Sequence, residues 1–174
     1  FNTNDVDAGE SIIEAASSGT DVVSVLTSTN FANMSASSFD NIEQIQFAGA
    51  GKTATFTGGQ LTGETLSLTE TVAGTSNLVV EVGSGETVTF ANISASTFTS
   101  GSDIISINGT TGNENITAPN LASTISGNNG SDTITGGSAA DTLNGNAGND
   151  TITGGDGSDS LIGGAGDDTY VFNT

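Results

Sequence analysis

The sequence predicts an all-β protein, a parallel β-solenoid whose last third is a β-roll. A nine-residue repeat runs from Gly127 to Val171, and short alternating apolar segments separated by Gly, Ser and Asn precede it. The chain has 20 acidic residues against one cation and a formal net charge of −19. Such a composition is also typical of disordered segments, but the acids are placed with a period and apolar residues recur throughout. The nine-residue period of the acids and the alternation of the apolar residues both favour a folded solenoid.

Residues 1–99 are expected to form a β-rich, solenoid-like region, and residues 100–174 the roll. The first element is a short helix from Glu10 to Ser17, where Ser11 and Glu14 form a capping box. The segment from Phe31 to Phe39 recurs as residues 90–98, which predicts an internal structural repeat. Between the two copies, the segments TATFT, ETLSL, NLVVEV and ETVTF have the alternation and the flanking turn residues of short strands.

The spacing of the apolar centres predicts how these strands stack. Val25, Phe47, Leu68 and Phe90 are separated by 21 or 22 residues, which suits one solenoid coil per interval. We therefore expect the N-terminal coils to continue edge to edge into the roll.

Five consecutive nonapeptides define the roll: GNNGSDTIT, GGSAADTLN, GNAGNDTIT, GGDGSDSLI and GGAGDDTYV. Position 1 is Gly, position 8 is apolar, and position 6 is always Asp. If the aspartates were scattered at random, five preassigned positions would all be Asp in about two of a million sequences. The same phase continues backwards, less regularly, over residues 100–126, where Glu114 alone keeps a carboxylate at position 6.

Two nonapeptides form one coil, so alternate repeats are stacked at the parallel-strand spacing of about 4.8 Å. The position-6 carboxylates then form two columns, Glu114, Asp132, Asp150 and Asp168 in one and Asp141 and Asp159 in the other. Neighbouring carboxylates at that distance repel by about 0.9 kcal/mol in water and about 3.5 kcal/mol at an effective dielectric of 20. A cation between them is therefore expected. Calcium suits carboxylates beside the carbonyls of Gly-rich turns, whereas zinc and copper are disfavoured without His or Cys.

The nonapeptide pattern resembles the RTX family of hemolysin-type calcium-binding repeats, closely over residues 127–171 and less closely over 100–126. The resemblance implies Ca²⁺ bound between alternate turns by the position-6 aspartates and neighbouring carbonyls. It also implies export from a bacterium by type I secretion and folding outside the cell. Three pairs are complete, and a fourth would use a glutamate, so about three or four ions are expected in the roll. The pairs are Asp132–Asp150, Asp150–Asp168, Asp141–Asp159 and Glu114–Asp132.

Weaker metal candidates lie beside these columns and at the N-terminus. Asp156 and Asp167, at positions 3 and 5, are candidates through their backbone carbonyls. Asp5, Asp7 and Glu10 alternate before a turn as in a calcium loop, but without the full EF-hand spacing. The alternative interpretation is an acidic turn that opens the helix.

The turn that contains Ala139 departs from the pattern, because position 4 is Gly in the other four complete repeats. If that position is left-handed, alanine there costs about 1 kcal/mol. We therefore predict that the site of Asp141 and Asp159 is weaker than its neighbours.

Composition argues against several other functions. Nucleic acid and anionic membranes need cations, and no apolar run is long enough to span a bilayer. Without His or Cys there is no familiar activated nucleophile, and Lys52 in AGAGKTAT lacks the spacing of a phosphate-binding loop. A carboxylate pair for glycoside chemistry stays open. A two-rung threonine ladder at residues 133–135 and 151–153 could order water for ice binding, but two rungs are too few and Thr is a good strand residue.

The sequence therefore predicts a noncatalytic, calcium-triggered folding module of a large secreted or surface-attached bacterial protein, of adhesin or surface-layer type. The chain starts without Met and its last three residues repeat its first three, so it is expected to be a piece of a longer, extracellular chain with neighbouring repeats. Two alternatives remain open. The segment is an accessory module of a secreted hydrolase, or its N-terminal half binds carbohydrate at a cell surface, against which the shortage of aromatic residues argues.

Overall fold

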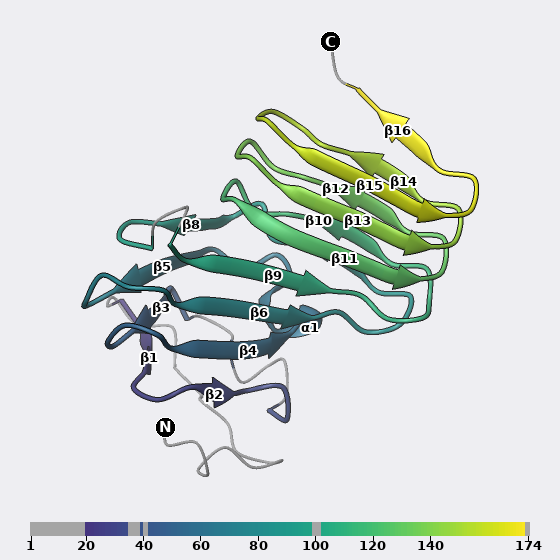
Figure 1. Cartoon of the computed structure of the whole chain (residues 1–174). Coiled ribbons are helices and arrows are strands. Elements are labelled where there is room, and N and C mark those ends of the chain that lie inside the picture. Colours follow the sequence, from purple (N-terminus) through teal and green to yellow (C-terminus); the bar gives the residue numbers. More distant parts are fainter. Residues whose placement is uncertain (1–19, 35–38, 40–41, 99–101, 173–174) are drawn as a thin grey trace.

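The chain forms a β-solenoid of about six turns, built from three all-parallel sheets (Figure 1). The computed structural model describes residues 20–34, 39, 42–98 and 102–172. A four-stranded sheet contains β1 (Val22–Val25), β3 (Gln44–Phe47), β5 (Leu66–Glu70) and β8 (Ile93–Ala95). A five-stranded sheet contains β7 (Thr87–Thr89), β10 (Asn115–Thr117), β12 (Thr133–Thr135), β14 (Thr151–Thr153) and β16 (Thr169–Val171). The predicted fold class is confirmed.

The third sheet has seven strands and runs along nearly the whole described molecule. It contains β2 (Thr29–Asn30), β4 (Thr53–Thr57), β6 (Asn77–Glu81), β9 (Ile104–Asn108), β11 (Ser123–Asn129), β13 (Thr142–Ala147) and β15 (Ser160–Ala165). All four strand segments expected between the Phe31 and Phe90 copies are present as β4, β5, β6 and β7.

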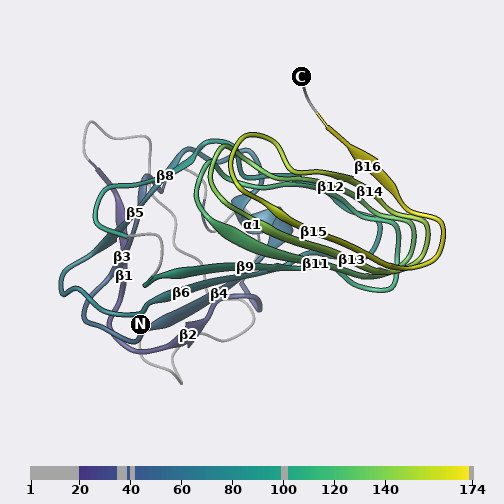
Figure 2. The ribbon, with the colours of Figure 1, turned by 45° about the horizontal axis from the view of Figure 1, so that its top comes forward.

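The N-terminal coils and the roll share two sheets. Strand β6 pairs with β9 in the seven-stranded sheet, and β7 pairs with β10 in the five-stranded sheet. The four-stranded sheet ends at β8, so the solenoid narrows there from three sides to two (Figure 2). The expected edge-to-edge continuation is confirmed, while the division into separate folding regions at residue 100 stays a prediction.

The coil lengths differ in part from those expected. Val25 pairs with Phe47 as predicted, but Leu68 pairs with Ile45 on one side and Ala95 on the other. Phe90 follows β7 and belongs to no strand of the four-stranded sheet. The interval from Leu68 to its next partner is longer than expected, because the chain forms β7 of the five-stranded sheet before it returns to the four-stranded sheet at β8.

The described part of the chain contains one short helix, α1 (Gly58–Leu61), which the sequence did not predict. The Gln60 side chain accepts a hydrogen bond from the Thr57 amide at 2.7 Å and donates to the carbonyls of Phe31 and Met34, each at 2.8 Å. A Thr followed three residues later by Gln is a capping-box signature that could have located it. The expected helix from Glu10 to Ser17 lies outside the described residues.

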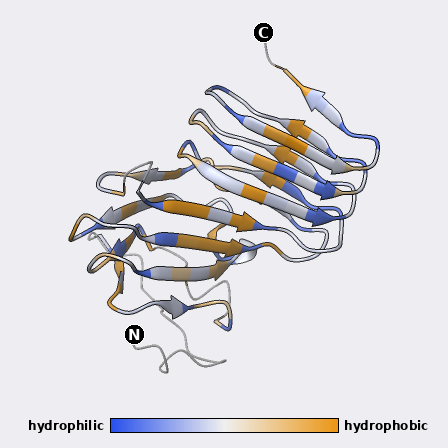
Figure 3. Cartoon of the chain, in the orientation of Figure 1, coloured by the Kyte–Doolittle hydropathy of each residue, from blue (hydrophilic) through white to orange (hydrophobic). Residues whose placement is uncertain are grey.

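The core follows the alternation of each strand (Figure 3). In the roll, six position-8 residues are fully buried, namely Ile107, Ile116, Ile125, Ile134, Leu143 and Ile152, whereas Leu161 is partly buried and Tyr170 is exposed in the last coil. In the wider N-terminal coils, phenylalanines fill the centre, with Phe31 stacked on Phe56 at 4.8 Å between ring centroids. The internal repeat has a structural counterpart, because Met34 donates to the Phe31 carbonyl and Ile93 to the Phe90 carbonyl, each at 2.9 Å.

Candidate metal centre

The five position-6 aspartates each stand directly before a strand of the roll. Asp132, Asp150 and Asp168 precede β12, β14 and β16 of the five-stranded sheet, and Asp141 and Asp159 precede β13 and β15 of the seven-stranded sheet. Because those strands pair in register with an offset of 18 residues, the aspartates are aligned in two columns.

In each column, one carboxylate oxygen accepts the backbone amide of the aligned residue one coil earlier. Oδ1 accepts from the amide nitrogen in all five cases: Asp132 from Glu114 at 2.7 Å, Asp150 from Asp132 at 2.8 Å, Asp168 from Asp150 at 3.0 Å, Asp141 from Ser123 at 2.8 Å and Asp159 from Asp141 at 3.0 Å. The aspartate thus fixes its own coil on the preceding one. This role needs only one of its two oxygens.

The second oxygen is unsatisfied in the first column. Oδ2 of Asp132 and Oδ2 of Asp150 are buried and have no hydrogen-bond partner, and each residue is 1% exposed. Burial raises the pKa of Asp132, and repulsion from Glu114 and Asp150 raises it further, against a lowering by the Glu114 amide. A buried carboxylate oxygen without a donor is costly, so this position favours a cation.

Glycine at position 1 makes room for that oxygen. A Cβ added at Gly127 would overlap Oδ2 of Asp132 and would lie 3.0 Å from the Gly145 carbonyl oxygen. A Cβ at Gly145 would overlap Oδ2 of Asp150 and lie 2.7 Å from the Gly163 carbonyl oxygen. The role of this glycine is therefore steric, and it leaves a carboxylate and a carbonyl oxygen together, which are ligands that calcium prefers.

Within the described residues, no three acidic side chains come together as a metal cluster. Each turn brings one carboxylate to its site. Ca²⁺ takes six to eight oxygen ligands, so backbone carbonyls of the turns would have to supply many of them. At position 2 of two repeats the turn is left-handed, because Asn128 and Asn146 have φ angles of 72° and 74°.

The second column has a different local structure. Oδ2 of Asp141 accepts a hydrogen bond from the Gly137 amide at 2.9 Å. Burial raises the pKa of Asp141, and repulsion from Asp159 adds to this, while the amides of Gly137 and Ser123 lower it. Ala139 is not left-handed, since the described non-glycine residues with positive φ are the two asparagines of position 2. The expected strain at Ala139 is therefore wrong, because this turn follows another backbone path.

Glu114 occupies the head of the first column but is satisfied by protein donors. Its Oε1 accepts from the Gly85 amide at 2.9 Å and from Thr110 Oγ1 at 3.0 Å, and its Oε2 accepts from the Thr110 amide at 2.9 Å. The side chain therefore ties the roll to the preceding coil without a cation. An ion between Glu114 and Asp132 stays a prediction.

The remaining sequence candidates lie away from the columns. Asp156 and Asp167 are exposed, and their amides donate to the Gly137 carbonyl and to Asn149 Oδ1 at 3.1 and 2.9 Å. Their carbonyls as calcium ligands stay a prediction. The N-terminal candidates Asp5, Asp7 and Glu10 lie outside the described residues.

Sequence reasoning missed two carboxylates that clamp N-terminal coils in the same way. Asp103 Oδ1 accepts from the Ser76 amide at 2.9 Å, and Glu43 Oε2 accepts from the Asp21 amide at 2.8 Å. Both acids stand just before a strand, as the position-6 aspartates do. That placement was a signal available in the sequence.

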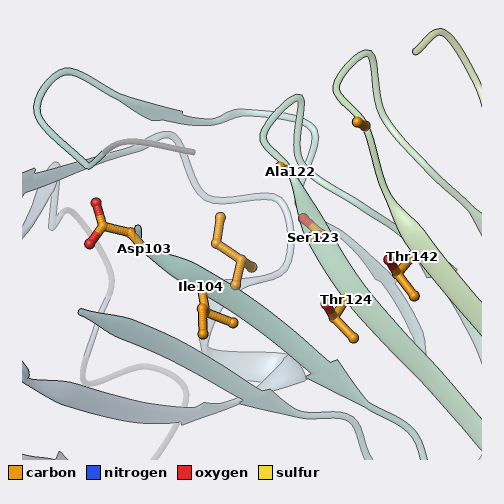
Figure 4. Close-up of a pocket in the computed structure, with 8 residues that line it drawn as sticks. Asp103, Ile104, Ala122, Ser123, Thr124 and Thr142 are labelled. Atoms are coloured by element: carbon orange, nitrogen blue, oxygen red, sulfur yellow. The ribbon is translucent and has the colours of Figure 1, made fainter. Parts of the chain in front are cut away.

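An open hollow of about 150 Å³ lies where the solenoid narrows, beside Asp103 and Ser123 (Figure 4). Asp103 is its only ionisable lining residue and already holds the Ser76 amide. The Ser123 hydroxyl of the lining donates to the Leu121 carbonyl at 2.7 Å.

The fold and the site together define a class of protein. A two-sided parallel solenoid with columns of strand-initial carboxylates, each beside a close glycine, is a repeat-built calcium-binding β-roll. Residues 108–141, 120–152 and 135–170 match the family model of the RTX calcium-binding nonapeptide repeat, so residues 108–170 are RTX repeats. No curated protein and no solved structure matches the chain. Among the described residues, no helix is long and apolar enough to cross a membrane.

Proposed function

We propose that this chain is a calcium-triggered folding module of a secreted or surface-attached bacterial protein, of adhesin or surface-layer type, and that its role is structural. The single observation that carries the proposal is the pair of buried, unpartnered Oδ2 atoms of Asp132 and Asp150. Bound calcium would supply the positive charge that these oxygens lack.

Without calcium, the first column opposes folding. Each neighbouring pair of carboxylates at about 4.8 Å contributes between about 0.9 and about 3.5 kcal/mol of repulsion, depending on the effective dielectric. Burial of the unpartnered oxygens adds a desolvation cost. A net stability of about 5–15 kcal/mol is usual for a domain, so these costs are large enough to keep the roll expanded.

With calcium, the balance reverses. Extracellular calcium modules bind with dissociation constants of about 10⁻⁴–10⁻³ M, and binding to the folded state alone stabilises it by mass action. A chain that stays expanded in a calcium-poor cytosol and folds at millimolar calcium suits export through a secretion channel.

The N-terminal coils are expected to behave differently. Glu43 clamps two of these coils together, and at the start of the roll Asp103 and Glu114 accept the amides of Ser76 and Gly85 in the last N-terminal coil, in each case from protein donors. We therefore infer that residues 1–99 fold without calcium and provide a preformed edge, at β6 and β7, on which the roll stacks. The calcium requirement would then begin after Glu114, inside the region of residues 100–174 and not at its first residue.

Circular dichroism and hydrogen exchange test the proposal together. In chelator, amides of β12 to β16 should exchange rapidly while those of β3 to β6 stay protected, and calcium should protect both sets. Magnesium at the same concentration is the control, because it demands a tighter octahedral geometry and gives up its waters reluctantly. A roll that is equally protected in chelator would refute the calcium trigger.

A noncatalytic accessory module of a secreted hydrolase is the second candidate, since the same folding behaviour would serve it. A catalytic domain encoded beside this segment would favour that alternative, and tandem copies of the segment would favour the adhesin type. Carbohydrate binding by the N-terminal half has less support, because Phe31, Phe39, Phe56 and Phe90 are buried and present no ring to a sugar. A glycan-binding screen tests it.

A further inference from the structure

Three asparagines of the chain are followed directly by glycine, and all three lie in the RTX repeats. They are Asn108, Asn129 and Asn144. In an Asn–Gly pair the asparagine side chain is open to attack by the next backbone nitrogen, because glycine has no Cβ to hinder the approach and its backbone is the most flexible. The repeats therefore contain three steps that are chemically labile wherever the local backbone is free to move.

The reaction is deamidation, and it needs no enzyme. The glycine nitrogen loses its proton to base in the solvent and attacks Cγ of the asparagine, whose amide nitrogen takes up a proton and leaves as ammonia. The product is a five-membered cyclic imide. Water then opens the imide at one of its two carbonyls and leaves either aspartate or isoaspartate. Each event replaces a neutral amide with a carboxylate, and isoaspartate also adds one carbon to the main chain.

Strand geometry opposes this ring closure at all three sites. The ring forms only when the glycine nitrogen turns to the side of Cβ about the Cα–C bond of the asparagine. Asn108, Asn129 and Asn144 are residues of β9, β11 and β13. An extended backbone holds the next nitrogen roughly a third of a turn away from Cβ. Each asparagine must therefore leave its sheet before it can react.

The attacking nitrogens are also engaged in the stacking of the coils. The Gly109 amide donates to the Ser126 carbonyl at 2.7 Å, and the Gly130 amide donates to the Ala147 carbonyl at 2.8 Å, in both cases in the next coil. Gly145 lies inside β13, which pairs with β11 on one side and with β15 on the other. An amide proton held in a hydrogen bond is harder to remove, so each coil protects the step in the coil before it.

We propose that Asn108, Asn129 and Asn144 are sites of spontaneous deamidation in the unfolded roll, and that folding protects them. Protection by folding follows from the strands and hydrogen bonds alone. That calcium controls this protection rests on the proposed function.

Deamidation is incompatible with the stacked coils. Asn108 Nδ2 donates to Glu81 Oε1 at 3.1 Å, and a carboxylate at residue 108 turns this contact into a repulsion. Asn144 pairs in register with both neighbouring strands, and an extra main-chain carbon there shifts Gly145 away from its place beside Oδ2 of Asp150. A chain that stays unfolded thus loses the ability to form the roll, whereas a chain that folds in time keeps it.

Peptide mapping by mass spectrometry tests the proposal on the parent chain. The chain is incubated at mildly alkaline pH, either folded in millimolar calcium or unfolded in urea with chelator, and isoaspartate is confirmed by enzymatic methylation. Conversion at the three sites should be at least about a hundredfold slower in the folded chain, since only the opened state reacts. Asn146 is the matched control, because it lies two residues from Asn144 but precedes Ala147, and in urea it should convert severalfold more slowly.

Equal rates in calcium and in urea would overturn the proposal, and so would equal conversion of Asn144 and Asn146 in urea. Chelator without urea separates the proposal from the calcium trigger. If calcium controls folding, Asn129 and Asn144 convert in chelator as they do in urea. Protection in chelator, together with rapid conversion in urea, would contradict the calcium trigger and still support the protection by folding.

A refolding experiment tests the consequence. After ageing in urea, the fraction of the parent chain that refolds in calcium, followed by circular dichroism, should fall in step with the deamidated fraction. The variant with Asn108→Gln, Asn129→Gln and Asn144→Gln should keep the refolding yield of its own unaged sample, because glutamine would have to close a six-membered ring. Full refolding of a converted parent chain would overturn the proposed loss of folding.

Discussion

Replacing Asp150 with Asn should change stability in opposite directions with and without calcium. The asparagine keeps an oxygen to accept the Asp132 amide, so the stacking hydrogen bond survives. The atom that changes is Oδ2, which is buried and unpartnered. An amide nitrogen in place of Oδ2 would lie near the Gly163 carbonyl oxygen, because a Cβ added at Gly145 would meet both atoms.

The magnitude follows from the position of Asp150 in the middle of its column. In chelator, the substitution removes repulsion from Asp132 and from the half-buried Asp168, at about 0.9–3.5 kcal/mol for each neighbour, as well as the burial of one charge. We expect a gain of about 1–3 kcal/mol after solvent screening. In calcium, the same residue would belong to two of the three complete sites that the sequence predicts. A tenfold loss of affinity at each costs about 3 kcal/mol.

Two measurements separate these effects. The trimethylamine N-oxide concentration needed to fold the roll in chelator should fall in the variant, because this osmolyte drives burial without a metal. The calcium concentration at the folding midpoint should rise. Asp167→Asn is the matched control, since it removes one charge from an exposed neighbour and should change neither midpoint much. If Asp150→Asn destabilised the chain in chelator as well, the column would not be a repulsive, calcium-requiring element.

Three further outcomes are expected. Asp159→Ala should lose less calcium affinity in a titration than Asp150→Ala, because the Gly137 amide already engages the second oxygen of its column partner Asp141; a larger loss would contradict this ranking. Burial raises the folded-state pKa of Asp132 and Asp141, so in chelator the folded state binds more protons than the unfolded chain. That stabilisation is complete below the ordinary value near 3.8 and is lost as pH rises through the raised pKa, and circular dichroism should therefore show acid-promoted folding without calcium. Gly127→Ala should destabilise the calcium-loaded chain by about 1–3 kcal/mol in denaturant unfolding, since its Cβ overlaps Oδ2 of Asp132; an unchanged midpoint would rule out the steric role.

The regular part of the fold was predictable because its signals are local and repeated. The nonapeptide fixes strand, turn and inward residue every nine positions, and coil stacking follows from that period. The N-terminal coils were less predictable. Their interval lengthens where β7 enters, which moves the partner of Leu68 from Phe90 to Ala95. Apolar spacing alone cannot show whether a coil has two sides or three.

The residues of the candidate site could be predicted from the sequence, but the differences between its individual turns could not. Position 6 identifies every aspartate of the columns, yet only the backbone path of each turn decides where its second oxygen goes. The strain expected at Ala139 assumed that all turns are alike, and the structure gives that turn another path. Tyr170 counts as one more apolar position 8 in the sequence, but its hydroxyl accepts the Gly163 amide at 2.7 Å. Gly109, which is aligned with Gly163 three coils earlier, donates the equivalent bond to the Ser126 carbonyl of the next coil.

One device therefore recurs along the solenoid, and the proposed calcium dependence is a variation on it. Before β3, β9 and the five strands β12 to β16, a carboxylate accepts an amide of the preceding coil, which secures the stacking in sheets of either width. The variation lies in the remaining oxygen. In Glu114 protein donors satisfy it, and under the proposed function that coil would need no metal. In Asp150 it is buried and has no partner, and there the same clamp is expected to oppose folding until a cation binds. Under the proposed function, a change of side chain at one position per turn would thus be enough to convert a constitutive solenoid into a calcium-triggered one.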